Sequence, residues 1–436
     1  MTYDPQMQAA RREAVAARMR QQGGGVMLLP AAEEKTRNAD SEYPFRQDSD
    51  FAYLTGFDEP TGCALLFADG RYVLFVRPRD AEREIWTGRR AGVEGALRDR
   101  GATEAHPVSE MEARLPGFLD RAGTLWFRLG HDAAWDARVA HVLRELRGRA
   151  RAGAVAPARI VDAGSILHEL RLFKSPEELR DLRRAAEITA EAHLAAMRDG
   201  QPGRREYQVQ AEIEYAFRRR GGSGPGYGTI VAAGANATVL HYRAGDEELR
   251  DGDLCLVDAG GEHGFYTADV TRTFPVSGTF TKAQRAAYEV VLDAQRRGIA
   301  ATRPGATVDA VHDVVVRRLV EGMIALGLLA GGVEERIADG AYKRYYMHRT
   351  SHWLGMDVHD VGAYHVGGAS RPLEPGMVLT MEPGLYVPPG DAAAPEGLRG
   401  LGIRIEDDLL VTADGNENLT EAIPKEPREV EAACTR

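Results

Sequence analysis

The segment DLCLVDAGGEHGFYTADVTRTFPV, residues 253–276, decides the fold class of the second half of this chain. Two apolar runs lie on either side of a glycine-rich turn, a pattern typical of paired antiparallel strands. Because side chains alternate along a strand, Asp258 lies on the same side as Leu254 and Leu256. A charge in such a position is unfavourable unless another group compensates it. The segment therefore predicts an antiparallel sheet that carries a functional acid.

Three further acids occupy similar positions. Asp269 lies in the second run of the same segment, Glu382 ends MVLTMEP (377–383), and Glu406 lies inside GIRIEDDLLV (402–411). A single acid of this kind is readily explained as a strand end that faces water. Four together in an apolar setting would neutralise themselves by raised pKa values unless a cation were present. The set therefore predicts a metal site.

Histidines are concentrated in MHRTSHWLGMDVHDVGAYH, residues 347–365, which holds four of the twelve in the chain. They are His348, His352, His359 and His365. We interpret part of this cluster as functional, and His365 as an ordinary surface or core residue. Hard oxygen ligands with one imidazole suit Mn, Co, Fe or Zn better than Ca or Mg. Five ligands are used better by two ions that share carboxylates than by one ion.

The chain of 436 residues is long enough for two domains. Residues 1–173 alternate short apolar runs with helical stretches, which predicts an α/β domain. Residues 174–436 read as α+β, with helices backing a largely antiparallel sheet. A capping box from Ser175 to Glu178 begins the second domain. Another box at Thr281 predicts a helix as far as Pro304, and a further helix is expected over about 307–327.

Composition excludes several classes of protein. The formal net charge of -10 gives no basic surface for nucleic acid. Cys63, Cys255 and Cys434 are odd in number and form no disulfide framework, which indicates a reducing compartment. The sequence has neither the apolar core of a signal peptide at its start nor a run of about 20 apolar residues. We therefore expect a cytoplasmic protein without membrane contact.

These motifs together resemble aminopeptidase P, a proline-specific branch of the pita-bread metallopeptidases. The resemblance is carried by residues 37–60, 168–178, 241–276, 347–362, 374–386 and 402–412. It implies a pita-bread catalytic domain that hydrolyses the N-terminal Xaa-Pro bond of peptides with a hydroxide held between two metal ions, for which Mn²⁺ is favoured and Co²⁺, Fe²⁺ or Zn²⁺ are alternatives.

The resemblance also implies individual roles. Asp269 and Glu406 would bridge both ions, Asp258 would bind one, and His352 with Glu382 would complete the other. Glu382 would also accept and return the proton. The donor types agree with the set inferred from the residues alone.

The histidines that match His241, His348 and His359 line the cleft in this family, and Arg404 orients a carboxylate. Two interpretations without a role in the site also stay open at the level of sequence. His241 in TVLHY (238–242) also fits a strand histidine packed in the core, and Arg404 also fits a cross-strand ion pair.

Aromatic side chains are expected to receive the proline ring. Trp86, Trp353 and Tyr386 are the candidates, and each fits plain core packing equally well. In the family, the residue matching Trp86 reaches a neighbouring subunit, which implies a homo-oligomer, either a tetramer or a dimer.

Three alternatives remain. A prolidase, which cleaves only Xaa-Pro dipeptides, shares the ligand set, although SHWLG (351–355) and EIWTGRR (84–90) favour the aminopeptidase. Methionine aminopeptidase would not need the first domain. A non-catalytic pita-bread protein that binds peptides would be expected to have lost ligands. The loop HVGGASRPLEPG (365–376) departs from the family pattern, which leaves the fine specificity open.

Overall fold

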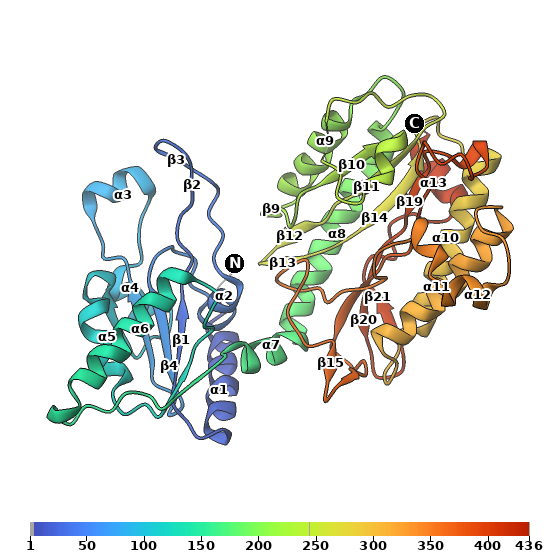
Figure 1. Cartoon of the computed structure of the whole chain (residues 1–436). Coiled ribbons are helices and arrows are strands. Elements are labelled where there is room, and N and C mark those ends of the chain that lie inside the picture. The colour runs from blue at the N-terminus through green and yellow to red at the C-terminus, as the bar shows by residue number, and fades with distance from the viewer. Residues whose placement is uncertain (1–3, 244, 436) are drawn as a thin grey trace. The chain divides into compact units, whose positions relative to one another are not determined.

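A computed structural model describes residues 4–243 and 245–435. The chain divides into two compact units, Met1–Leu170 and Arg171–Arg436 (Figure 1). The boundary expected from sequence, after residue 173, lies close to this division. Helix α7 (Gly164–Leu172) spans it.

The N-terminal unit is built on a mixed six-stranded sheet in the order β6-β5-β4-β1-β7-β8. Strand β1 pairs antiparallel with β4 and parallel with β7, as in an α/β domain. The strands are β1 (Val26–Pro30), β4 (Cys63–Phe67), β5 (Tyr72–Val76), β6 (Glu104–Pro107), β7 (Thr124–Trp126) and β8 (Arg159–Val161), and a separate hairpin joins β2 (Thr36–Asn38) to β3 (Ser41–Glu42). The helices are α1 (Pro5–Gln21), α2 (Ser49–Thr55), α3 (Ala81–Thr87), α4 (Gly92–Asp99), α5 (Met111–Leu119) and α6 (Ala133–Gly148). The predicted α/β class is confirmed.

The C-terminal unit consists of several small antiparallel sheets. The first joins β10 (Ile230–Ala233), β11 (Leu254–Asp258) and β14 (Thr271–Pro275), and the second joins β9 (Gly224–Pro225), β12 (Gly261–His263) and β13 (Tyr266–Thr267). A third joins β17 (Val378–Met381), β20 (Asp407–Val411) and β21 (Asn416–Asn418), and two-stranded sheets pair β18 (Gly384–Tyr386) with β19 (Gly402–Arg404) and β15 (His365–Val366) with β16 (Ala369–Ser370). The predicted antiparallel arrangement is confirmed.

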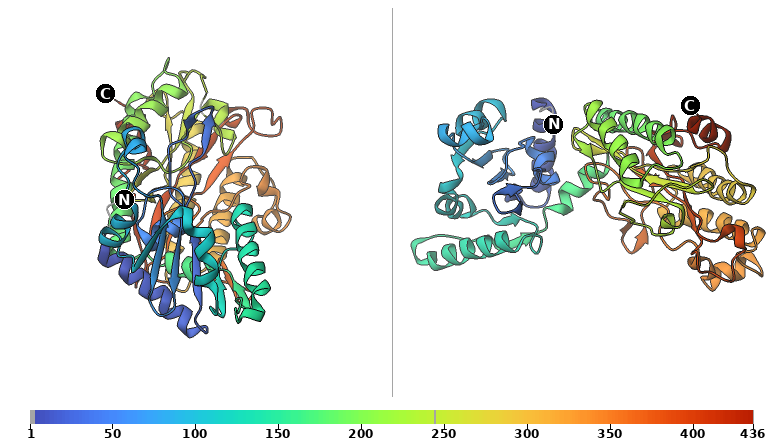
Figure 2. Two further views of the ribbon diagram at one scale, coloured as in Figure 1. Left: turned by 90° about the vertical axis from the view of Figure 1, so that its left-hand side faces the viewer. Right: turned by 90° about the horizontal axis from the view of Figure 1, so that it is seen from above.

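The C-terminal unit also contains helices (Figures 1 and 2). They are α8 (Pro176–Asp199), α9 (Glu206–Arg219), α10 (Lys282–Ala301), α11 (Val308–Ala325), α12 (Val333–Ala338) and α13 (Pro427–Cys434). Both predicted capping boxes are formed, at the starts of α8 and α10. Helix α8 packs on β12 and β13, and α10 packs on β17 and β19. Because the apolar faces of helices and sheets bury one another, a single large core forms between them.

Two of the expected strands are interrupted where their acids lie. Asp269 falls in the gap between β13 and β14, and Glu406 falls between β19 and β20. The two gaps lie side by side, because the Glu406 amide donates to the Thr271 carbonyl over 3.0 Å. The strand interpretation of TVLHY is wrong: a 3₁₀ turn (Gly234–Thr238) leads into an irregular loop, and His241 is exposed there.

In residues 4–243 and 245–435, none of the helices combines the length and the apolar character that crossing a bilayer requires.

Candidate metal centre

The five predicted ligands come from separate segments of the C-terminal unit, and all line one cavity of about 1280 Å³. Asp258 is the last residue of β11 and Glu382 directly follows β17. Asp269 and Glu406 lie in the strand gaps, and His352 lies in the irregular segment that precedes β15. Strand ends and gaps direct acidic side chains into the cavity while the adjacent apolar residues stay in the core.

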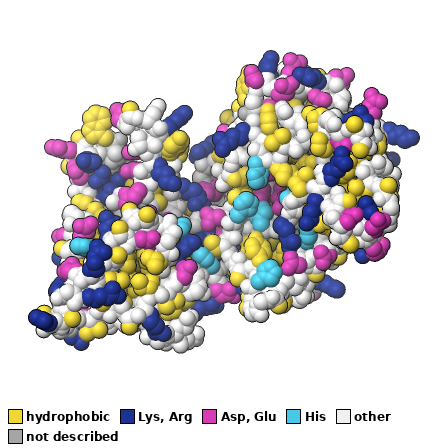
Figure 3. Space-filling view, viewed as in Figure 1, with side chains coloured by type: hydrophobic (Ala, Val, Ile, Leu, Met, Phe, Trp, Pro, Cys, Tyr) yellow, Lys and Arg dark blue, Asp and Glu magenta, His cyan; other side chains and the backbone are white. Residues whose placement is uncertain are grey.

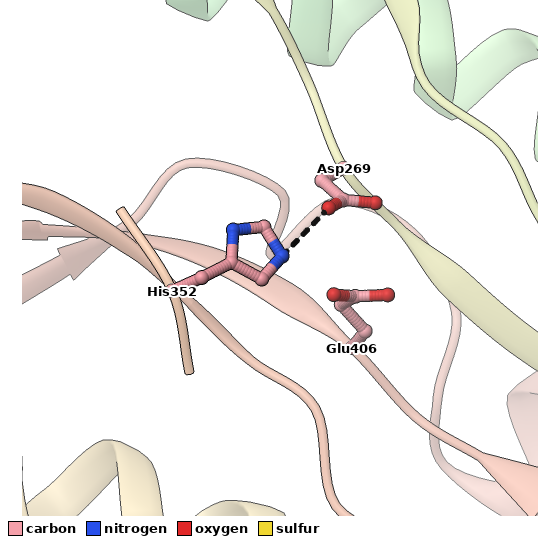
Figure 4. A group of neighbouring side chains, drawn as sticks. All are labelled: Asp269, His352 and Glu406. Atoms are coloured by element: carbon pink, nitrogen blue, oxygen red, sulfur yellow. Dashed lines mark ion pairs between the residues drawn. The ribbon is translucent and has the colours of Figure 1, made fainter. Parts of the chain in front are cut away.

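Three of the five come together most closely. Asp269, His352 and Glu406 each offer a ligand atom, and these atoms lie within 4.8 Å of one another (Figure 4). His352 Nε2 lies 3.2 Å from Asp269 Oδ2. Its Nδ1 donates to the Trp353 carbonyl over 3.0 Å, which leaves Nε2 directed at the acids. A backbone carbonyl that fixes the ring in this way is a frequent partner of metal-binding histidines.

The other two acids lie at the edge of this group. Glu382 Oε1 is 3.8 Å from His352 Nε2. Both oxygens of Asp258 are already engaged, since Oδ1 accepts from the Tyr227 hydroxyl over 2.6 Å and Oδ2 accepts from Arg404 over 2.5 Å. Asp258 is therefore held from two sides by protein donors.

The electrostatics of the site show that these acids have too little positive charge beside them. Burial raises the pKa of Glu406 well above its usual value, and the nearby charges of Asp269 and Glu382 raise it further. Burial likewise raises the pKa of Asp258 and of Glu382, only partly offset by Arg404 for the first and by His352 and Arg404 for the second. Clustered carboxylates of this kind require added cations to remain ionised. Oxygen and imidazole donors suit divalent ions, so the residues fit a metal centre.

The imidazole of His352 supports this interpretation. Burial lowers its pKa, but the hydrogen bond and charge of Asp269, together with Glu382, outweigh burial and raise the pKa to about 9. The carboxylates thus attract whatever positive charge is available, a proton on His352 included.

Two sequence comparisons decide the family. Residues 180–413 match the family model "Metallopeptidase family M24", and residues 8–126 match "Aminopeptidase P, N-terminal domain". The chain belongs to metallopeptidase family M24. Its use of divalent metal follows from this membership and from the ligand group described above.

Known M24 relatives resemble the chain over nearly its full length. The Xaa-Pro aminopeptidase of Escherichia coli (strain K12) is 48% identical over 97% of this chain and 96% of its own length. The structure of Pseudomonas aeruginosa aminopeptidase PepP superposes with a TM-score of 0.96 at 46% identity, covering 100% of this chain and 99% of that one. A zinc-substituted E. coli aminopeptidase P in complex with product gives a TM-score of 0.95 at 46% identity, with 100% and 99% coverage.

In this M24 peptidase, Arg404 links two of the acids. It is buried, with 4% of its surface exposed, and besides Asp258 it donates from Nε to the Thr271 hydroxyl over 2.9 Å. The Thr271 hydroxyl in turn donates to Glu406 over 2.6 Å. Arg404 therefore fixes one acid directly and a second through a single hydroxyl group.

The three predicted cleft histidines all line the cavity, and Figure 3 shows histidine side chains gathered on one face of the C-terminal unit. His348 accepts at Nε2 from the Tyr386 hydroxyl over 2.9 Å and donates from Nδ1 to the Arg349 carbonyl over 2.7 Å. Burial lowers its pKa to about 3, so it is neutral. Burial and the nearby His352 also lower the pKa of His359, whose ring lies 4.5 Å from that of His352.

The aromatic candidates occupy different environments. Trp353 and Tyr386 are buried in the core, with 0% and 1% of their surface exposed, and neither lines the cavity. Trp86 lies on α3 of the N-terminal unit and is 87% exposed. The aromatic lining consists instead of tyrosines that the sequence reasoning did not single out, among them Tyr227 and Tyr364.

Tyr364 stacks on Trp353 with ring centroids 5.1 Å apart, so the buried tryptophan supports the exposed ring. Its position within the histidine-rich segment was the available signal. Tyr227 lies in GPGYG (224–228), where the density of glycine was the only hint.

Proposed function

We propose that this chain removes the N-terminal residue from peptides whose second residue is proline, using two divalent ions. The observation that carries the proposal is the convergence of Asp269, His352 and Glu406 within 4.8 Å, in a cavity that Asp258 and Glu382 also line. Family membership makes the chain a metal-dependent hydrolase of peptides, and its relatives include Xaa-Pro aminopeptidases.

By the resemblance to aminopeptidase P, Asp269 and Glu406 would serve both ions; their ligand atoms and that of His352 lie within 4.8 Å of one another. Asp258 is assigned to one ion, and His352 with Glu382 to the other. Bound divalent ions would supply a water molecule of lowered pKa and would polarise the scissile carbonyl. Manganese suits the oxygen-rich donor set, with Co²⁺, Fe²⁺ and Zn²⁺ as alternatives.

Glu382 is assigned the transfer of protons. Its carboxyl lies 3.5 Å from His348 Nδ1 and has a pKa raised by burial, which suits a group that accepts and returns a proton near neutral pH. It would take a proton from the attacking water and deliver it to the proline nitrogen that leaves.

The three cleft histidines are assigned to the substrate. A neutral imidazole can donate one hydrogen bond, so His359 beside His352 is placed to stabilise the negative charge that develops on the carbonyl oxygen. His241 is exposed at the cavity wall and would bind the peptide backbone beyond the proline. His348, with both nitrogens engaged by the protein, would act through its ring surface and through Tyr386.

Recognition of proline would use shape, because the imide nitrogen carries no hydrogen to bind. Tyr227 and Tyr364 offer ring surfaces in the cavity, whereas contact of Trp86, Trp353 or Tyr386 with substrate stays a prediction. We assign restriction of the substrate and contacts between subunits to the N-terminal domain, with a tetramer or dimer expected. Location in the cytoplasm likewise stays a prediction.

The test compares matched Xaa-Pro and Xaa-Pro-Yaa-Zaa peptides, incubated with protein reconstituted with Mn²⁺, and identifies the products by mass. We expect release of the first residue from the longer peptide. Cleavage confined to the dipeptide would instead indicate a prolidase. The similarity to Xaa-Pro aminopeptidases does not favour this alternative. Absence of cleavage together with absence of bound metal would indicate a non-catalytic binding protein.

A further inference from the structure

Glu206, the first residue of α9, forms a buried hydrogen-bonded cluster outside the metal centre. It has no exposed surface. Its Oε1 accepts from the Ala233 amide and from Asn236 Nδ2, each over 2.9 Å. Its Oε2 accepts from the Tyr242 hydroxyl over 2.9 Å and from the Gly245 amide over 3.1 Å. One carboxylate thus satisfies four donors.

The four partners restrict which side chain can occupy position 206. Each of the four groups donates its hydrogen, so the side chain at position 206 has to accept at every point. A carboxylate has enough lone pairs for this purpose, whereas the amide of a glutamine would direct its NH₂ group at two of the donors. The phenol of Tyr242 remains a donor, because burial and the neighbouring Glu206 raise its pKa to about 12.

The donors belong to a single segment, and that segment forms part of the cavity wall. Residues 240–243, which include His241, all line the cavity. The wall is fixed from several points, since Asn236 also donates to the Tyr242 hydroxyl over 3.0 Å and the Tyr207 amide donates to the Gly245 carbonyl over 3.2 Å. By contrast, the His241 side chain is exposed and lies outside any regular helix or strand.

We propose that Glu206 and Tyr242 are positioning residues that set the place of His241 in the cavity, and so its contact with the peptide backbone beyond the proline. This inference rests on the proposed function, which gives His241 that contact. The reason is entropic: Leu240 and Tyr242 of this irregular loop are only partly buried against apolar clusters, so the hydrogen bonds at its base limit the geometries that remain.

The first test is Tyr242→Phe, which removes one hydroxyl and keeps the ring. We expect kcat/KM for a long Xaa-Pro peptide to fall about tenfold, the range for loss of a hydrogen bond to a charged acceptor. Metal content should not change. Tyr207→Phe, which alters a half-exposed tyrosine next to Glu206 on the same helix, is the matched control and should behave as the unmodified protein.

A double-mutant cycle separates positioning from general stability. In a His241→Ala background, Tyr242→Phe should cause little further loss in kcat/KM, because both changes act on the same contact. Independent, additive losses would overturn the proposal, as would full activity of Tyr242→Phe alone.

Glu206→Gln should have the larger effect, since it disturbs two donors at once. An activity-independent measurement is hydrogen exchange of the Gly245 amide, with the ring signals of His241 followed by NMR. We expect faster exchange and shifted His241 signals in Tyr242→Phe and in Glu206→Gln, if the latter folds. Unchanged signals would refute the anchoring. If the unmodified protein cleaved no Xaa-Pro peptide, the proposed function would be wrong. The NMR spectra would still test whether Glu206 and Tyr242 fix the position of His241.

Discussion

Glu406 and Asp407 are consecutive residues, both buried, with 2% and 0% of their surface exposed, yet the protein treats their charges in opposite ways. Asp407 accepts from Arg272 over 2.6 Å and from Lys425 over 2.7 Å. Glu406 accepts from the uncharged Thr271 and lies beside another acid, Asp269. The two side chains thus lie in one core only a peptide bond apart. Asp407 forms ion pairs with protein cations, whereas the hydrogen-bond donor to Glu406 is an uncharged hydroxyl.

The pKa values follow this difference. Burial would raise the pKa of Asp407, but Arg272 and Lys425 outweigh burial and hold it below its usual range. Burial raises the pKa of Glu406, and the nearby acids add to the effect. Asp407 is thus neutralised by cations of the chain, whereas the charges that act most strongly on Glu406 are those of other acids.

A second pair repeats the pattern. His359 lines the cavity, while the next residue, Asp360, is paired with Lys174 over 3.1 Å and with Arg171 over 2.6 Å. Burial would raise the pKa of Asp360, but these two cations lower it. Structural ion pairs therefore lie directly behind the cavity wall and support it.

The largest effect is expected for Glu406→Gln, which replaces the carboxylate by a neutral amide of the same shape. We expect kcat/KM to fall by at least about 10³-fold with loss of bound metal, because metal assistance contributes several kcal/mol to catalysis. Metal-free protein should lose no stability, since glutamine resembles the protonated carboxyl that burial and the nearby acids favour at this position. Peptide assays, elemental analysis and urea unfolding in chelator check the three points. A fully active, metal-loaded variant would exclude a role for Glu406 in holding metal.

The counterpart is Asp407→Ala. We expect the free energy of unfolding to decrease by about 3–5 kcal/mol, because Arg272 and Lys425 would remain buried without their partner. Urea unfolding provides the measurement, and folded protein should retain metal. A loss below about 1 kcal/mol would show that Asp407 is not a structural partner of these two cations.

A smaller effect is expected for Arg404→Lys, which retains the charge but not the planar fork. Arg404 also donates to the Tyr386 hydroxyl over 3.0 Å. The single nitrogen of a lysine cannot reach Asp258, Tyr386 and Thr271 as the planar guanidinium does, so Asp258 should lose its fixed orientation. We expect metal affinity to weaken about 10- to 100-fold, the usual range for changes behind metal ligands. Titration of metal-free protein with Mn²⁺ measures the change, and unaltered affinity would contradict it.

The smallest effect is on the pH dependence of stability. In metal-free protein the folded-state pKa values of Glu406 and Asp258 lie above their ordinary values. Between the ordinary and the raised pKa, the folded state binds more protons than the unfolded state, so the free energy of unfolding decreases as pH rises. The slope is at most about 1.4 kcal/mol per pH unit for each carboxyl.

Bound metal should remove this slope, because the carboxylates are then ionised and paired. Asp407 has the opposite sign: its depressed pKa adds stability above its ordinary value, which is lost only as pH falls below it. Urea unfolding from about pH 5 to pH 8, with and without Mn²⁺, tests both statements. Buried histidines such as His348, whose folded-state pKa is lowered, add a slope of opposite sign below about pH 6.5, so the slope of Glu406→Gln is compared with that of the unmodified protein; an unchanged slope would contradict the charge assignment.

Much of the prediction rested on patterns among residues that are close in the sequence. The capping boxes at Ser175 and Thr281 began helices as expected, because a cap depends on residues only three positions apart. The five candidate ligands could be named because acids in apolar runs and clustered histidines are visible along the chain, and the structure brings all five to one cavity. The strand gaps at Asp269 and Glu406 were not foreseen, since alternation continues through a break in the hydrogen-bonded ladder.

By itself, the sequence determined which side chains form the candidate site and which family the chain resembles, because the type and the order of the donor residues can be read directly from the chain. Only the tertiary structure decided which acids are compensated: Arg272 lies 135 positions from Asp407, Arg404 lies 146 from Asp258, and Tyr227 lies 31 from Asp258. Pairing across such separations follows from how the sheets and helices pack together, and packing is a property of all the segments at once.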